Sequence, residues 1–304
     1  MDGKAIVVFR SREGIRAFPD ICPHRSAPLS EGRVTGGNIE CPYHGWQFDG
    51  EGRCRHIPGM VEALPRIHLT ALPIREQDGL VFISRGPPMG APYAGRLAGH
   101  DVIPAIHESR VQSTVLDVAE NILDATHTHF IHKGLLRGLG NRRHRTQVGI
   151  TGGEGWVEAR YEGEPRQDGV VSRLLEGRRG ISIGRFMAPG IAEIEFWGPG
   201  RVNLVTTFHL RQETPSTVAG LGILTGPKDH GWGYVRAMIF RPLFDIALAQ
   251  DRQILSATSR NREMFDHPGP VIGPLDILRS SIDAILHGRL PPVADRPVTM
   301  EMEL

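Results

Sequence analysis

The sequence has little of three features that would each point to a class of protein. Its 304 residues include only three cysteines, too few and odd in number for a disulfide framework. Its 35 Lys and Arg nearly cancel its 34 Asp and Glu, so it lacks the positive charge that attracts nucleic acid or anionic lipid. It also lacks any apolar run near the roughly 18 residues that span a bilayer, and it begins without the apolar core of a signal peptide. We therefore expect a cytoplasmic protein that acts on a small molecule and has no nucleic-acid or membrane partner.

Short strands and turns dominate the first part of the sequence. Glycine-containing turns separate its apolar stretches, and a proline- and glycine-rich segment at 85–92 is typical of a linker. This pattern predicts a small all-β domain over residues 1–88 and a second domain over 89–304. The strands that it predicts in the first domain include 5–10, 15–18 and 80–83.

The second part of the sequence mixes strand and helix patterns. A helix is predicted toward the end of 112–126, and a long helix with few breakers over 244–265. Runs of β-branched and aromatic residues predict strands between them. The second domain should therefore be an α+β domain in which a long helix packs on a curved antiparallel sheet. The predicted strands are 156–161, 192–197, 203–210 and 217–224.

Four metal-ligating side chains form two mixed pairs near the N-terminus. Cys22 and His24 make a Cys-x-His pair, and after sixteen residues Cys41 and His44 make a Cys-x-x-His pair. Two such loops can hold a [2Fe-2S] cluster with both thiolates on one iron and both imidazoles on the other, which raises its reduction potential. A structural zinc site uses the same ligand types, but it normally groups its cysteines together and its histidines together. The pattern favours the cluster.

A second group of metal-ligating residues lies between 121 and 132, where Asp124 is followed by His127, His129 and His132. Beside a redox cluster, this group suggests a site with two histidines and one carboxylate, which leaves positions on Fe(II) open for O₂. His127 and His132 are five residues apart and would need a bulged helical turn to converge. His129 and His132 are three apart and would share a helix face, so the residues alone allow either pair.

Both groups resemble the motifs of the Rieske oxygenases. The first resemblance covers 22–25, 29–32 and 41–48, and the second matches the pattern Asn-x-x-Asp-x-x-His-x₄-His. Electron-transport Rieske proteins usually add a cysteine pair that forms a disulfide, whereas this chain has only Cys54 besides its two loop cysteines. The family generally carries a few dozen residues before the segment that matches 5–10, and their absence here indicates a misassigned start or a trimmed domain.

The resemblance implies a role for each site residue. Cys22, His24, Cys41 and His44 would hold the cluster, and His127 and His132 would hold the iron. The resemblance places the third iron ligand in the late helix, where Asp251 is the choice among Asp245, Asp251, Glu263 and Asp266. His129 would be a spectator or would support a ligand. Asp124 would connect the cluster of one subunit to the iron of its neighbour.

The resemblance also implies an activity and partners. The catalytic domain would have the helix-grip fold, and the chain would resemble compact homotrimeric oxygenases such as vanillate demethylases and ketosteroid hydroxylases. A ferredoxin or flavin reductase would pass electrons from NAD(P)H to the cluster. A mononuclear Fe(II) would then use O₂ to hydroxylate or demethylate an aromatic, cyclic or sterol-like substrate.

Two other functions remain open: an electron-transfer Rieske protein with a non-catalytic binding domain, and a catalytically silent binding module. Residues that could line a pocket or fill the sheet core equally well are Leu204, Phe208, Leu221, Ile223, Met238 and Phe240.

Overall fold

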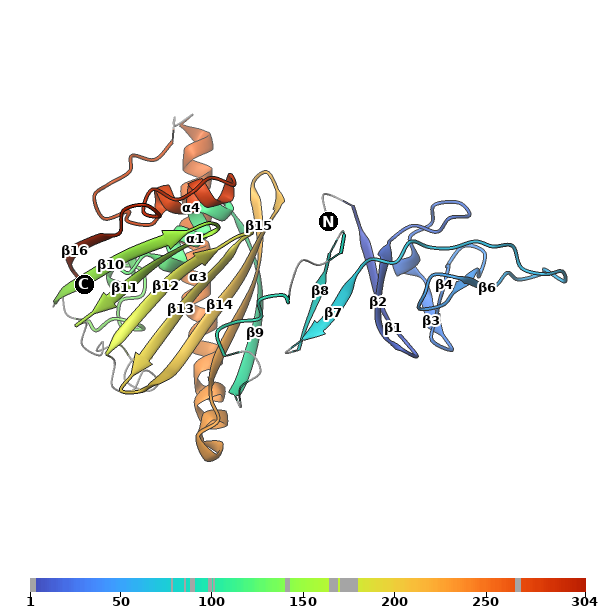
Figure 1. Cartoon of the computed structure of the whole chain (residues 1–304), viewed down its shortest axis with the longest axis horizontal. Helices are drawn as coiled ribbons and strands as arrows, with labels where there is room; N and C mark the ends of the chain where they lie inside the picture. Colours follow the sequence, from blue (N-terminus) through green and yellow to red (C-terminus); the bar gives the residue numbers. More distant parts are fainter. Residues whose placement is uncertain are drawn as a thin grey trace. The chain divides into compact units, whose positions relative to one another are not determined.

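The computed structural model describes residues 4–77, 79–84, 86–87, 91–97, 100, 102–139, 143–163, 169, 180–265 and 269–304. The chain divides into two compact units, Met1–Ala94 and Gly95–Leu304 (Figure 1). The predicted linker at 85–92 lies partly outside the described residues. The predicted boundary after residue 88 stays a prediction.

The first unit is built from short antiparallel hairpins. β1 (Ile6–Ser11) pairs with β2 (Gly14–Pro19), and β7 (Ile74–Gln77) pairs with β8 (Leu80–Ile83). These strands overlap the three that the sequence predicts in this domain. The unit also contains η1 (Leu29–Glu31) and a four-stranded sheet of β3 (Arg33–Thr35), β4 (Asn38–Glu40), β5 (Gln47–Phe48) and β6 (Cys54–His56).

Local sequence explains the tight geometry of this unit. The turn between β3 and β4 consists of Gly36 and Gly37, whose φ angles of 61° and 90° suit the two-residue hairpin turn that requires positive φ at both positions. Phe18, Leu29 and Phe48 are fully buried and form the centre of the core. The two ligand-bearing loops are therefore attached to a small but well-packed scaffold.

The second unit is an antiparallel sheet of eight strands. Consecutive strands from β10 to β15 are neighbours, β9 pairs with β15, and β16 closes the other edge beside β10. All four strands predicted here are confirmed, although each is longer than predicted. The strands are β9 (Val102–Gln112), β10 (Arg145–Gly153), β11 (Trp156–Glu162), β12 (Ile181–Met187), β13 (Ile191–Gly198), β14 (Arg201–Thr214), β15 (Thr217–Pro227) and β16 (Val298–Glu303).

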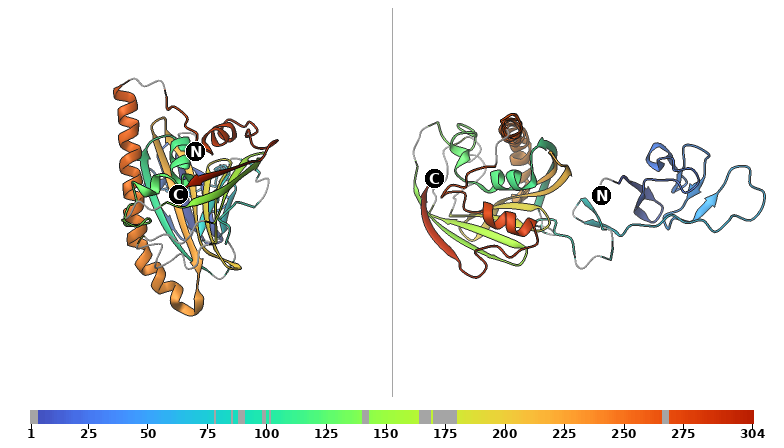
Figure 2. Two further views of the ribbon diagram at one scale, coloured as in Figure 1. Left: turned by 90° about the vertical axis from the view of Figure 1, so that its left-hand side faces the viewer. Right: turned by 90° about the horizontal axis from the view of Figure 1, so that it is seen from above.

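Helices pack on one face of this sheet. Figure 2 shows the long helix α3 running along the curved sheet, with α1 on the same side. The predicted α+β helix-grip architecture is confirmed. The helices are α1 (Val115–Leu123), α3 (Trp232–Met264) and α4 (Arg279–Leu286), with the short 3₁₀ turns η2 (His127–His129) and η3 (Asp229–Gly231).

The two predicted helices differ from the observed ones at their ends. Gln112 belongs to strand β9, and α1 begins only after Thr114, whose hydroxyl accepts a hydrogen bond from the Asp117 backbone N–H and so caps the helix. Helix α3 begins at Trp232 rather than 244 and contains Pro242, a residue that normally marks a helix boundary. Among the described residues, no helix is both long enough and apolar enough to cross a membrane.

A network of ion pairs holds α1 in place beside the sheet. Asp117 on α1 pairs with Arg262 on α3 and with Arg279 on α4, each at 3.0 Å, and Arg279 also pairs with Glu120. Three helices are thus tied together around the end of α1. The segment that follows this helix carries His127 and His132, two of the three candidate iron ligands, so the network stabilises the approach to the site.

Candidate metal centres

Two tight loops carry the four candidate cluster ligands. In the first, the Cys22 backbone N–H donates to the Ala27 carbonyl at 2.8 Å. In the second, the Cys41 N–H donates to the Trp46 carbonyl at 2.8 Å. Gly45 has a φ of 70°, and a Cβ on it would lie 2.9 Å from Pro58, so glycine is required there.

The four side chains of these loops differ sharply in burial. The thiols of Cys22 and Cys41 are buried, at 1% and 3% exposure, whereas His24 and His44 are exposed. The two imidazole rings lie 4.6 Å apart between centroids, and Trp46 stacks on His24 at 4.5 Å. A cluster held here would have its thiolate iron inside the domain and its imidazole iron at the surface.

The spread of these four side chains fits two irons better than one ion. Among the described residues, one group of three or more His, Cys, Asp or Glu side chains has all of its donor atoms within 4.8 Å of one another. That group lies in the second unit, so the donor atoms of these four loop side chains are spread more widely. A tetrahedral zinc ion would gather all four of its ligand atoms more closely than that. Burial also raises the pKa of the Cys22 thiol to about 11, so iron must displace a proton to bind there.

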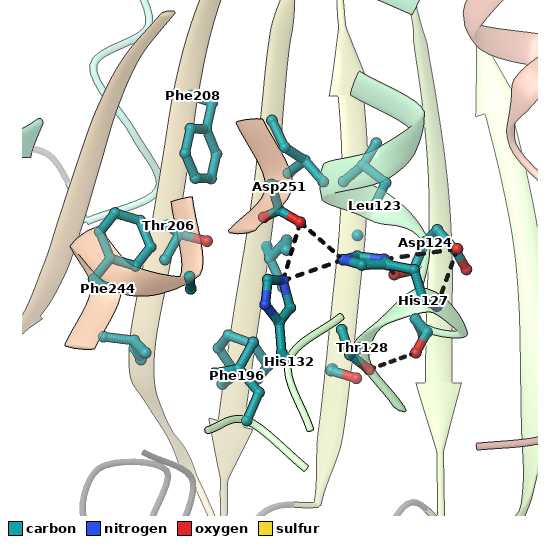
Figure 3. A pocket seen from close by; sticks show the side chains of 18 of the residues that line it. Leu123, Asp124, His127, Thr128, His132, Phe196, Thr206, Phe208, Phe244 and Asp251 are labelled. Atoms are coloured by element: carbon teal, nitrogen blue, oxygen red, sulfur yellow. Dashed lines mark hydrogen bonds and ion pairs between the residues drawn. The ribbon is translucent and has the colours of Figure 1, made fainter. Parts of the chain in front are cut away.

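The compact group in the second unit consists of His127, His132 and Asp251. The Nε2 atoms of the two histidines lie 3.3 Å apart, and Asp251 Oδ1 lies 3.5 Å from His127 Nε2 and 3.1 Å from His132 Nε2 (Figure 3). All three side chains are largely buried. Two imidazole nitrogens and one carboxylate oxygen facing a common point are the donor set of a 2-His-1-carboxylate iron site.

Hydrogen bonds fix how the two histidines face that point. His127 Nδ1 donates to the Asp124 backbone carbonyl at 2.7 Å, and His132 Nδ1 donates to Gln250 Oε1 at 2.9 Å. Each Nε2 is left without a proton in the neutral ring and can bind a metal. The sequence offered no signal for Gln250 beyond its position next to Asp251.

Electrostatics at the metal-free site follow from the pairing of these groups. Burial alone would lower the pKa of His127, but its bonds to Asp124 and Asp251 outweigh burial and raise that pKa to about 9. Burial would raise the pKa of Asp251, but His127 and His132 hold it well below its usual range. A divalent cation bound at His127 Nε2 would displace the extra proton that the ring carries in the metal-free site, because a ring nitrogen must be deprotonated to bind a metal.

Asp124 lies next to the site but outside the group of three. Its Oδ1 accepts hydrogen bonds from the Thr126 N–H and hydroxyl, both at 2.7 Å, and its Oδ2 accepts one from the His127 N–H at 3.2 Å. Figure 3 shows Asp124 on the side of His127 away from Asp251. Burial would raise the pKa of Asp124, but its bonds to His127 and Thr126 lower it, so the group is a carboxylate at neutral pH.

The local backbone brings the two histidines together without the bulged helix that their spacing suggested. Helix α1 ends at Leu123, η2 carries His127, and the chain then turns so that His132 faces the same point. The expectation of a helical bulge was therefore wrong. His129 is not a member of the converging group.

Of the three acids considered for the third position that the structure describes, only Asp251 on α3 joins the two histidines. Asp245 instead bonds to His107 Nδ1 at 2.7 Å and is 61% exposed. Glu263 is exposed, and Asp266 lies outside the described residues.

A cavity of about 160 Å³ opens beside this group. Of the six residues considered for a pocket, Leu204, Phe208 and Phe240 line it. Gly222 is the cross-strand partner of Phe208, so these two positions lie on the same face of the sheet. Leu221 and Ile223 flank Gly222 along the strand and therefore face the opposite side. Met238 is exposed. Thr206 also lines the cavity and was missed because nothing distinguishes it from other strand threonines.

Comparisons with known proteins agree with both units. Residues 1–73 match the Rieske [2Fe-2S] domain. The chain is 28% identical to the oxygenase component of dicamba O-demethylase from Stenotrophomonas maltophilia, over 66% of this chain and 58% of that protein. It is 31% identical to 4beta-methylsterol monooxygenase from Methylococcus capsulatus, over 64% of this chain and 52% of that protein. The matches thus span little more than half the length of these relatives.

The fold is shared with a solved structure. Crystalline dicamba monooxygenase bound to dicamba superposes with a TM-score of 0.72 at 20% identity, over 93% of this chain and 88% of that one. This likeness shows the fold of the chain. The chain thus contains a Rieske [2Fe-2S] domain, and the relatives it resembles in sequence are named as an oxygenase component and a monooxygenase.

Proposed function

We propose that the chain is a terminal oxygenase component, which takes electrons from a reductase and uses O₂ to hydroxylate or oxidatively demethylate a small organic substrate. One observation carries the proposal: His127, His132 and Asp251 converge beside a cavity in a chain that also contains a Rieske domain. An electron-transfer protein with a passive second domain would need neither the three converging ligands nor the cavity. Both features favour catalysis over that alternative.

In this proposal Cys22, His24, Cys41 and His44 hold the [2Fe-2S] cluster, and His127, His132 and Asp251 hold a mononuclear Fe(II). When bound, the iron would supply the activation of O₂ at the positions that three protein ligands leave open. The protein's own residues do the rest. Gln250 and the Asp124 carbonyl keep both Nε2 atoms directed at the metal, and the apolar cavity holds the substrate and excludes water.

Metal content and oxygen consumption test this proposal together. Purified protein should be brown, with three irons and two acid-labile sulfides per chain; two irons would indicate the cluster alone. With a surrogate reductase and NAD(P)H, one member of a panel of aromatic ethers, aromatic acids and sterols should stimulate O₂ uptake and yield an oxidised product. Protein loaded with all three irons that oxidises no substrate would contradict the proposal.

We also propose that electrons cross between subunits of a homotrimer through Asp124. Its carboxylate is ionised, 29% exposed and beside His127, while His44 is an exposed ring at the surface of the Rieske unit. A carboxylate that accepts hydrogen bonds from two imidazoles could connect His44 of one copy to His127 of the next. Such a head-to-tail contact closes into a ring when repeated.

Replacing Asp124 with Asn should separate electron transfer from metal binding. The amide preserves the shape but lacks the charge that favours two imidazole donors. We expect all irons to remain bound, whereas reoxidation of the reduced cluster by substrate and O₂ should slow by at least about a hundredfold, the upper end of effects for residues that support a metal ligand. Stopped-flow absorption in a single turnover measures this rate. A normal rate, or full activity in a strictly monomeric enzyme, would contradict the role of Asp124.

A further inference from the structure

The two imidazoles of the cluster loops lack the hydrogen bonds that orient the histidines of the iron site. His127 and His132 each donate a ring proton to a carbonyl oxygen, whereas within the described residues neither His24 nor His44 has a side-chain hydrogen bond. Metal-binding histidines are normally oriented by such a bond. The terminal torsion of histidine is broad, so an exposed ring is not fixed by its own rotamer. The proposed partner of His44 is Asp124 of a neighbouring copy, and His24 needs another contact.

A tryptophan supplies that contact for His24. The Trp46 indole lies flat on the His24 ring, with 4.5 Å between the ring centroids and 6° between the ring planes. This separation is that of offset-stacked aromatic pairs. Trp46 is half-buried and also packs against the hydrophobic core of the first unit. The indole that contacts the exposed imidazole is therefore held in place itself.

The stack joins two separate loops. His24 lies on the first loop and Trp46 on the second, and each loop is closed by a backbone hydrogen bond of its own. All three cysteines of the chain are free, so no disulfide ties the loops together. Another ring contact between the loops, His24 with His44 at 4.6 Å, involves two proposed ligands. Trp46 thus connects the loops through a side chain that is not a proposed ligand.

We propose that Trp46 is a positioning residue of the cluster site, whose indole fixes the plane of the His24 ring and ties the two ligand loops together where no disulfide does. The indole also covers one face of an otherwise exposed imidazole and so limits the access of water to the iron at the surface. This inference rests on the proposed cluster ligands of the first unit and requires no activity of the second.

Trp46→Leu tests this role in the purified, cluster-loaded protein. Leucine keeps an apolar side chain on the core but offers no flat ring, so the His24 ring should take several orientations. The electron paramagnetic resonance signal of the dithionite-reduced cluster should broaden and its g values should shift, because they report how the imidazoles are oriented on the iron. In air with EDTA, the visible absorption should decay at least about tenfold faster than in the parent, the lower end of effects for residues that orient a metal ligand.

The reduction potential is a readout that a purely structural role would not move. Reduction adds one negative charge to the cluster, and water stabilises that charge better than the face of an indole does. The midpoint potential of the Trp46→Leu protein should therefore be higher than that of the parent. Trp46→Phe keeps a flat apolar ring, so it should restore the g values and keep the decay rate within about threefold of the parent's.

Phe9→Leu is the matched control. Phe9 is an aromatic residue of the same core, but its ring contact is with Phe18, at 6.0 Å between centroids, rather than with a histidine. This replacement should lower the melting temperature of the protein, because it removes buried apolar contacts. The g values, the midpoint potential and the decay rate of the absorption should stay as in the parent.

Several outcomes would decide against this role. A brown Trp46→Leu protein with the parent's g values, potential and decay rate would overturn the inference, as would equal changes in Phe9→Leu. If Trp46→Leu takes up no cluster, Trp46→Phe decides: parent-like g values support the stack, and a colourless protein overturns it. A parent protein that binds no cluster would contradict both the proposed ligands and the inference. A cluster-loaded parent that oxidises no substrate would contradict the proposed function and leave the inference standing.

Discussion

Replacing Asp251 with Ala should give a brown protein that has lost its mononuclear iron and forms no product. The substitution removes one of three protein ligands and leaves His127 Nε2 and His132 Nε2 facing an empty space. Since even residues that only support a metal ligand change affinity by about 10–100-fold, loss of the ligand itself should exceed a hundredfold. The iron content, measured against the visible absorption of the cluster as internal standard, should fall from three irons per chain to two.

Asp245→Ala is the matched control for this variant. Asp245 lies on the same helix, six residues earlier, but its carboxylate is 61% exposed and bonds to His107 rather than to the iron ligands. The Asp245→Ala protein should keep three irons per chain and full activity. An Asp251→Ala protein that retains both would show that another acid completes the site.

Replacing Cys41 with Ala should remove the cluster from the first unit altogether. The Cys41 thiol is 3% exposed, at the inner end of a loop whose backbone is closed by the bond between Cys41 and Trp46. Without that thiolate, one iron loses a protein ligand, and the cluster becomes open to water and oxidation. The protein should be colourless, without acid-labile sulfide, and unable to take up electrons from a reductase.

Cys54→Ala is the control for the cluster experiment. Cys54 is also a buried, free cysteine of the same unit, with its thiol directed at the His56 carbonyl at 3.8 Å. Losing it removes a packed side chain and no proposed ligand, so the brown colour should persist. A colourless parent protein with stoichiometric zinc would contradict the cluster assignment before any variant is made.

The features that could be predicted from the sequence are those encoded by neighbouring residues. The Cys-x-His and Cys-x-x-His loops are short, so their spacing already limits which metal they suit. Four of the eight strands of the second sheet, β11, β13, β14 and β15, have runs of β-branched and aromatic residues strong enough to be recognised. By contrast, the third iron candidate lies more than a hundred residues from His132, and only the resemblance to the Rieske oxygenases pointed to Asp251.

The features that could not be predicted depend on tertiary packing. The predicted helix begins at 244, but α3 begins at Trp232 and continues through Pro242, a residue that normally interrupts a helix, while packed on the sheet. The pairing of His127 with His132 depends on the end of α1 at Leu123 and the turn after it, which no periodicity encodes. Gln250 and Thr206 matter only through what they face across the fold.

The site joins two segments that are remote along the chain. Gln250 and His132, which bond to each other, are 118 residues apart, and Asp251 follows directly. An ion held by His127, His132 and Asp251 would act as a cross-link that closes this long loop and that only the folded chain can form. Occupancy of the site and the folding equilibrium of the catalytic unit are then thermodynamically linked. The heat resistance of the protein would therefore depend on how much free iron its surroundings provide.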